Sequence, residues 1–234
     1  MWDSAPLLRM IANVLFGFSA IVLIYGALHF AVHQPGLFPL QTAKIETPTG
    51  HVVPQEVLQV LRREVNGNLF TVDIERVRLA LEQLPWVRKV SVRREFPNQL
   101  SLAIEEHEPL ARWNREALVN TYGEIFHAYS EESMPAFSGQ DGRSAEIARQ
   151  YQEFNQVLAQ VNLRIEQISL SPRHAWQVKL NNGLILALGQ EEVGRRLARF
   201  VTVYPYTLAP QATSIRGVDL RYRNGFAVDG TFNG

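Results

Sequence analysis

An uninterrupted apolar segment near the amino terminus constrains the architecture of this chain more than any other feature. Residues 10–32 read MIANVLFGFSAIVLIYGALHFAV and contain no Asp, Glu, Lys or Arg. As a helix, this segment would be about 34 Å long, which is enough to cross a bilayer. Only Asn13, Ser19 and His29 interrupt its apolar surface, whereas a helix in a soluble core would carry a polar stripe. We therefore predict a transmembrane helix at residues 10–32.

A cleaved signal peptide is the alternative to a permanent anchor. The apolar segment is long for a signal peptide, and no A-x-A-like cleavage site follows it, so we expect the helix to stay attached. Charge barely decides the orientation, because Arg9 on one side faces only Lys44, partly offset by Glu46, on the other. Residues 1–9 form a short tail, so the folded mass lies after the helix. A linker with two prolines, residues 33–41, follows it.

A short strand and two amphipathic helices are predicted after the linker. The segment TAKIE, residues 42–46, reads as the strand. Pro54 suits the first turn of one helix, and a second helix begins near Thr71 or Asp73. Apolar residues at helical spacing give each helix one inward face, formed by Val57, Leu58, Leu61 and Val65 in the first and by Ile74, Val77, Leu81 and Leu84 in the second.

Residues 84–106 read LPWVRKVSVRREFPNQLSLAIEE and alternate twice between apolar and charged side chains. A period of two is typical of a strand, and the FPNQ segment between the two stretches indicates a hairpin. The resulting order of strand, helix, helix, strand and strand makes residues 42–109 a small α+β domain, with two helices covering one sheet. The predicted inward residues of the hairpin are Trp86, Val90 and Val92 in the first strand and Leu100, Leu102 and Ile104 in the second.

The remaining residues, 110–234, are predicted to form a second, sheet-dominated α+β block with flanking helices. Turn residues indicate hairpins around residues 121–123, at Asn182-Gly183 and, in the closing strand pair, at Asn224-Gly225. Two amphipathic helices are expected at residues 145–161 and 192–204. Their inward residues are Ile147, Tyr151, Phe154, Leu158 and Val161 in the first, and Val193, Leu197, Phe200 and Tyr204 in the second.

The sequence carries no common signature of catalysis, nucleotide binding or zinc binding. G-x-G-x-x-G, P-loop, G-x-S-x-G and H-E-x-x-H motifs are all absent. His29 and His33 share i, i+4 spacing, but no third ligand is visible nearby, so we expect interfacial histidines rather than a metal site. The zero net charge argues against nucleic acid, and the chain has no cysteine. We predict no enzyme, no catalytic residue, no cofactor, no metal and no small-molecule substrate.

A sheet edge near the carboxyl terminus is the leading candidate for a functional surface. The segment VDLRYRNGFAV, residues 218–228, lies close to the end of the chain and presents Tyr222 and Phe226 beside Arg221 and Arg223. Strands with unpaired N–H and C=O groups recruit other strands, and aromatic residues and arginine anchor interfaces. The alternative is an ordinary edge strand whose charged residues prevent pairing. The sequence alone leaves both open.

These segments together resemble the FtsQ/DivIB family of bacterial cell-division proteins. LFTVDIERVRLALEQLPWVRKVSVRREFPNQLSLAIEEHEPLARW is similar to the POTRA module of that family, a β-α-α-β-β domain. LVNTYGEIFHA, MPAFSG, SPRHAWQVKLNNGLILALG, RRLARFVTVY and VDLRYRNGFAV resemble successive landmarks of the second, β domain of the family. The resemblance covers nearly the whole chain.

The resemblance implies a scaffold of the division machinery. It implies a single-pass inner-membrane protein of type II, with a cytoplasmic amino terminus, a periplasmic bulk and enrichment at the division septum. The implied partners are FtsB and FtsL at the β domain and upstream division proteins such as FtsK at the POTRA module. By motif match, the partner-binding residues of the family fall on Arg221, Tyr222, Gly225 and Phe226.

The chain departs from the pattern of the family at its end. After GFAV it reads DGTFNG, where many relatives have an aromatic residue soon after the valine, so Phe232 is the candidate substitute. Two rival functions are a POTRA-bearing envelope transport component and a membrane-tethered envelope enzyme. The first should continue into a barrel of many alternating strands, and the second should contain a pocket with convergent polar groups.

Overall fold

The structure is a computed structural model that describes residues 5–34, 40, 42–46, 50–211, 214–223 and 225–230. The chain divides into two compact units, Met1–Glu106 and His107–Gly234. The predicted α+β class is confirmed, with an amino-terminal apolar helix, a small three-stranded domain and a larger sheet-rich unit. Phe232, the candidate aromatic residue near the end of the chain, lies outside the described residues.

The amino-terminal helix, α1, extends over Ala5–His33 and is 29 residues long. Its stretch Pro6–Val32 is long and apolar enough to cross a membrane by length and composition. The helix begins five residues before the predicted start at Met10, because residues 5–9 include Pro6, which suits a first turn, and two leucines. The prediction of one long apolar helix here is confirmed.

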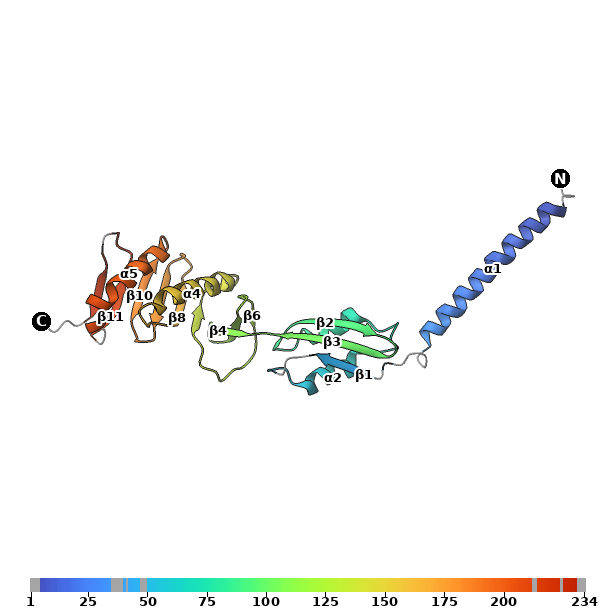
Figure 1. Cartoon of the computed structure of the whole chain (residues 1–234), viewed down its shortest axis with the longest axis horizontal. Coiled ribbons are helices and arrows are strands. Elements are labelled where there is room, and N and C mark those ends of the chain that lie inside the picture. Colours follow the sequence, from blue (N-terminus) through green and yellow to red (C-terminus); the bar gives the residue numbers. More distant parts are fainter. Residues whose placement is uncertain are drawn as a thin grey trace. The chain divides into compact units, whose positions relative to one another are not determined.

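The rest of the first unit is a three-stranded domain of residues 42–106 with the predicted element order (Figure 1). Its sheet has the strand order β1-β3-β2, in which β1 runs parallel and β2 antiparallel to the central β3. Pro54 occupies the first turn of α2, and the Asp73 carboxylate accepts a hydrogen bond from the Arg76 N–H at 3.0 Å to cap α3. The elements are β1 Thr42–Glu46, α2 Pro54–Glu64, α3 Ile74–Leu81, β2 Val87–Glu95 and β3 Gln99–Glu106.

Two residues that were predicted to point inward, Leu58 and Trp86, lie outside the core of the three-stranded domain. Leu58 is 41% exposed and lines a shallow groove beside Thr42, because Val57 and Leu61 form the centre of the apolar face and Leu58 lies at its rim. Trp86 precedes β2 and stacks on His51, with ring centroids 3.8 Å apart. The buried residues of this core are Val57, Leu61, Val72, Val77, Leu81, Val87, Val90, Leu100, Leu102 and Ile104.

The second unit is built on one large mixed sheet. Among the described residues, nine strands follow the order β12-β11-β10-β9-β8-β7-β4-β5-β6. The two long helices pack on the same face of this sheet, with α4 over β8 and α5 over β10 (Figure 1). The elements are β4 Pro109–Trp113, β5 Ala117–Asn120, β6 Ile125–Phe126, β7 Ala136–Ser138, α4 Ser144–Ala159, β8 Ile165–Leu170, β9 Trp176–Leu180, β10 Ile185–Gly189, α5 Val193–Thr207, the 3-10 turn η1 Ala209–Gln211, β11 Ile215–Asp219 and β12 Ala227–Gly230.

The helices and early hairpins of the second unit confirm the sequence periodicities. β5 pairs with β6 around residues 121–123, and β9 pairs with β10 around Gly183, whose φ of 84° suits a glycine. The largest fully buried side chains that join the inner faces of both helices to the sheet are Phe137, Phe154, Phe200, Ile147, Leu158, Ile168, Leu180 and Leu184.

The closing strand pair differs from the predicted tight hairpin. Pairing between β11 and β12 stops at Asp219 opposite Ala227, so residues 220–226 form a longer connection instead of a two-residue turn. Asn224, half of the predicted turn, lies outside the described residues. Leu220 is fully buried, and its N–H donates to the Ala187 carbonyl at 2.9 Å, which carries the chain past the end of β11 before it can reverse.

Candidate partner-binding edge

The last strand of the chain, β12, lies at one end of the large sheet. It pairs with β11 on one side, and no strand among the described residues pairs with its other side. Its sequence is AVDG, in which only Asp229 is charged, so it has little of the charge that usually protects an exposed edge. Gly230 allows close pairing with β11, because a Cβ atom there would lie 2.4 Å from the Ser214 carbonyl oxygen. The edge is therefore short, weakly charged and closely joined to β11.

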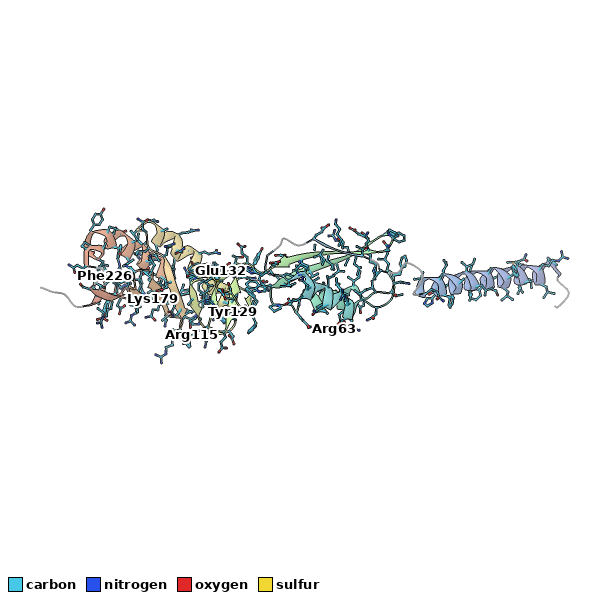
Figure 2. The ribbon with its side chains drawn as sticks, turned by 90° about the horizontal axis from the view of Figure 1, so that it is seen from below. Arg63, Arg115, Tyr129, Glu132, Lys179 and Phe226 are labelled. Carbon is cyan, nitrogen blue, oxygen red and sulfur yellow. The ribbon has the colours of Figure 1, made fainter. Side chains whose placement is uncertain are left out.

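The four residues that sequence reasoning singled out lie in the connection between β11 and β12, not within a strand. Tyr222 is 58% exposed. Phe226 is half-buried against the core of the second unit, and it immediately precedes β12 (Figure 2). Arg221 is exposed, and Gly225 is half-buried. The structure therefore brings all four residues to one end of the edge strand.

Arg221 is held by Asp219 at the end of β11. Its Nη2 atom donates to Asp219 Oδ2 at 2.6 Å and its Nε atom to Oδ1 at 2.9 Å. The side-chain hydrogen bond from Arg221 lowers the pKa of the Asp219 carboxyl below its ordinary value. Because the pKa of Asp219 is lowered, the contribution of the Asp219–Arg221 pair to the stability of the fold is present at neutral pH. It is lost only as the pH falls through the folded-state pKa of Asp219. Asp219 is therefore ionised and able to pair with Arg221 throughout the neutral range.

Arg199, which sequence reasoning did not single out, fastens the connection to α5. Its guanidinium donates to the carbonyl oxygens of Arg223 at 2.6 Å, Tyr222 at 2.9 Å, Gly225 at 3.2 Å and Leu220 at 3.4 Å. One arginine on the amphipathic helix α5 therefore holds the backbone on both sides of Tyr222. The sequence does hold one signal for this role. Arg196 and Arg199 are three residues apart on α5 and each adjoins an inward residue, Leu197 or Phe200, so both arginines lie near the sheet.

A basic cavity adjoins the same connection. It has a volume of about 420 Å³ and is lined by polar and charged side chains, namely Glu192, Arg195, Arg196, Arg199, Tyr222 and Arg223. Arg196 also donates to the Leu188 carbonyl at 2.6 Å, which ties α5 to the end of β10. The cavity gives the edge a positive flank on the α5 side.

A shallow depression lies beside the edge on the other face of the sheet. Ile185 and Ala187 line it, and they alternate with Leu186, which is buried beneath the helices. Ile185 is 38% exposed, and Gly217 and Ala227 extend the depression toward β12. A strand added to β12 could place alternate side chains against this apolar surface.

Removal of the Arg199 side chain tests the four hydrogen bonds from Arg199 to the connection, which we call the Arg199 clamp. Arg199→Ala is expected to lower the free energy of unfolding of the second unit by about 1–3 kcal/mol, because four backbone carbonyls, two of them in part-buried hydrogen bonds, lose a charged donor. Arg195→Ala is the matched control, since that side chain is 82% exposed and pairs only with exposed Glu192 among the described residues; its expected effect is below about 0.5 kcal/mol. Urea unfolding of both variants measures the difference, and equal values would contradict the clamp.

The described residues show no arrangement for metal chemistry. Among them, no group of three or more His, Cys, Asp or Glu side chains could hold a metal ion. The His29 ring lies 6.1 Å from the Tyr25 ring within α1, and the side chain of His33 is outside the described set.

Comparisons with known proteins match both folded parts. Residues 111–221 match the family model described as cell division protein FtsQ/DivIB, C-terminal, and residues 38–107 match the POTRA domain, FtsQ-type. The chain is 42% identical to the cell division protein FtsQ of Nitrosospira multiformis, over 99% of this chain and 100% of that protein. It is 35% identical to FtsQ of Burkholderia pseudomallei, over 97% and 94%, and 36% identical to FtsQ of Shewanella oneidensis, over 91% and 84%.

Proposed function

Because the chain belongs to the FtsQ/DivIB family of bacterial cell-division proteins, we propose that it acts as a non-enzymatic scaffold of the division machinery. In this proposal α1 anchors the chain in the inner membrane, with the amino terminus in the cytoplasm, the two folded units in the periplasm and enrichment at the septum. Residues 1–9 are the tail, 10–32 the span, 33–41 the linker, 42–109 the POTRA domain and 110–234 the FtsQ-type β domain.

The edge strand β12 carries the proposal. Its outer side is not paired with any strand in the described part of the chain, and Asp229 is the one charged residue of this strand. A segment of the FtsB–FtsL complex joins this edge as an added strand and gains backbone hydrogen bonds. Tyr222, with Arg221 and Phe226 nearby, supplies the side-chain contacts that select the partner. Division proteins that arrive earlier, such as FtsK, bind the POTRA domain.

The sheets of the two domains also support the proposed scaffold function. Each contains an open mixed sheet with edge strands, and the family membership places the chain among division proteins. An anchored scaffold confines its partners to the plane of the membrane, which raises their effective concentration for one another. The chain therefore links upstream division proteins to septal cell-wall synthesis by binding alone.

Replacement of Tyr222 tests the selective contact. Tyr222→Ala is expected to weaken binding of the FtsB–FtsL complex by more than about 1 kcal/mol, or more than about fivefold, because an exposed aromatic side chain at an interface loses most of its contact area. Tyr206→Ala is the matched control, since Tyr206 is 84% exposed on α5 and should leave affinity unchanged. Titration of the full chain in nanodiscs measures both, and equal affinities would count against the proposed site.

A further inference from the structure

The three-stranded domain has a defined membrane-proximal end. β1 runs parallel to β3, with Thr42 opposite Gln99, so the chain arrives from the membrane beside the start of β3. The turn between β2 and β3, residues 96–98, lies at this same end. Gln34 and Thr42 are eight positions apart in the sequence, so their Cα atoms lie at most about 29 Å apart. The β2–β3 turn therefore lies at the end of the domain that the chain enters from α1.

Asn68 places a second loop at this end by an independent contact. Its Nδ2 atom donates to the Val32 carbonyl at 2.6 Å and to the Gln34 carbonyl at 3.1 Å, which are at the carboxyl end of α1. The Asn68 side chain also accepts from the N–H groups of Phe70 at 2.9 Å and Thr71 at 3.0 Å. One buried side chain thus joins the 68–71 loop to the last turn of the helix.

Two exposed aromatic side chains lie at this end of the domain. Phe70 is 41% exposed and Phe96 is 70% exposed, and their rings meet edge to face with centroids 6.0 Å apart. Arg94 holds the loop of Phe70 against β2, since its Nε atom donates to the Leu69 carbonyl at 2.7 Å and its Nη2 atom to the Val72 carbonyl at 2.9 Å. Phe70 and Phe96 therefore lie on a surface that the Arg94 hydrogen bonds hold in place, and the Arg94 guanidinium is nearby.

We propose that Phe70 and Phe96 insert into the headgroup region of the bilayer that α1 spans. Phenylalanine is among the residues that bury an apolar face at the boundary of headgroups and acyl chains, and transfer of exposed apolar area out of water is favourable. The partner is the bilayer surface, because the Thr42–Gln99 register and the Asn68 hydrogen bonds each bring this end to the helix exit. The inference rests on the proposed membrane anchoring by α1. It adds that the three-stranded domain contacts the bilayer directly and is not attached to it through the linker alone.

Single-cysteine labelling of the full chain tests the insertion, because the protein has no cysteine of its own. The chain is reconstituted in phosphatidylethanolamine and phosphatidylglycerol vesicles, with an NBD fluorophore at Phe70→Cys or Phe96→Cys. Leu79→Cys is the matched control, since Leu79 is 50% exposed on α3 of the same domain. Phe18→Cys in α1 reports on the anchor itself.

Labels at positions 70 and 96 are expected to be quenched by doxyl lipids and to be several-fold less sensitive to iodide than the label at position 79. Water-like behaviour at 70 and 96, with lipid quenching at 18, would overturn the insertion while leaving the anchor intact. Water-like behaviour at 18 as well would refute the anchor and the insertion together. Shielding that develops only after addition of FtsB and FtsL would identify a protein-binding surface and likewise overturn the proposal.

A second substitution separates aromatic insertion from simple proximity. Phe96→Ser in the chain labelled at position 70 is expected to raise iodide quenching several-fold, since the neighbouring ring no longer holds the loop in the interface. Leu79→Ser in the same labelled chain should change nothing. Circular dichroism of each variant checks that the domain remains folded. Unchanged shielding after Phe96→Ser would mean that the rings do not hold the domain at the bilayer.

Discussion

Proline on the edge strand β12 is expected to lower the affinity for the FtsB–FtsL complex by at least about 100-fold, or about 2.7 kcal/mol. An edge strand tolerates proline when the missing N–H would point to solvent, but an interior strand does not. Binding by strand addition would turn β12 from an edge strand into an interior one. Proline on its outer side should therefore leave the free protein folded and still prevent the complex.

Two neighbouring substitutions make this test independent of which N–H points outward. Val228 pairs with Val218 and Asp229 with Gly217, and successive residues of a strand direct their N–H groups to opposite sides. One of Val228→Pro and Asp229→Pro thus removes an outward donor, and the other disrupts pairing with β11. Thermal unfolding identifies the variant that keeps its stability, and that variant should lose binding in the nanodisc titration.

Alanine at the same positions is the control for the side chains. Val228→Ala and Asp229→Ala keep the backbone donor, so their expected effects on affinity stay below about 1 kcal/mol. A stable proline variant that binds the complex with normal affinity would exclude strand addition at β12. The partner would then have to bind through side chains of the connection, such as Tyr222, without extending the sheet.

Local periodicity was enough to predict most elements of this fold. The four-and-three spacing of Ile147, Tyr151, Phe154 and Leu158 predicted a helix at residues 145–161, and α4 extends over Ser144–Ala159. The alternation in residues 84–106 likewise predicted the β2–β3 hairpin. These patterns succeed because burial of one face depends on residues within the same element.

Features that depend on distant residues were not predictable in the same way. The parallel pairing of β1 with β3 and of β10 with β11 joins strands that are far apart in the sequence. The Arg199 clamp reaches backbone carbonyls more than twenty residues away, and backbone groups leave no signature in a sequence. The position of Tyr222 in a connection, rather than in a strand, follows from that clamp and from buried Leu220.

Truncation of Phe200 is expected to destabilise the second unit by about 3–5 kcal/mol, a large part of the stability of a typical domain. Phe200 is fully buried on α5, and its ring lies 5.3 Å from the ring of Tyr204. Tyr206→Ala on the same helix is the matched control, since this 84% exposed side chain should contribute less than about 0.5 kcal/mol. Peptide-resolved hydrogen exchange of the full chain measures both variants.

The same substitution is expected to affect the candidate edge, because Phe200 precedes Val201 and follows Arg199 on α5, and Arg199 donates to the connection that precedes β12. When α5 loosens, the guanidinium can no longer hold the carbonyls of Tyr222 and Gly225, so exchange should rise in residues 220–226 together with α5. Affinity for the FtsB–FtsL complex should then fall in Phe200→Ala although no side chain of the edge has changed. Faster hydrogen exchange in α5 with unchanged exchange in the connection would show that pairing with β11 alone holds the edge. Arg199 would then have no part in positioning Tyr222.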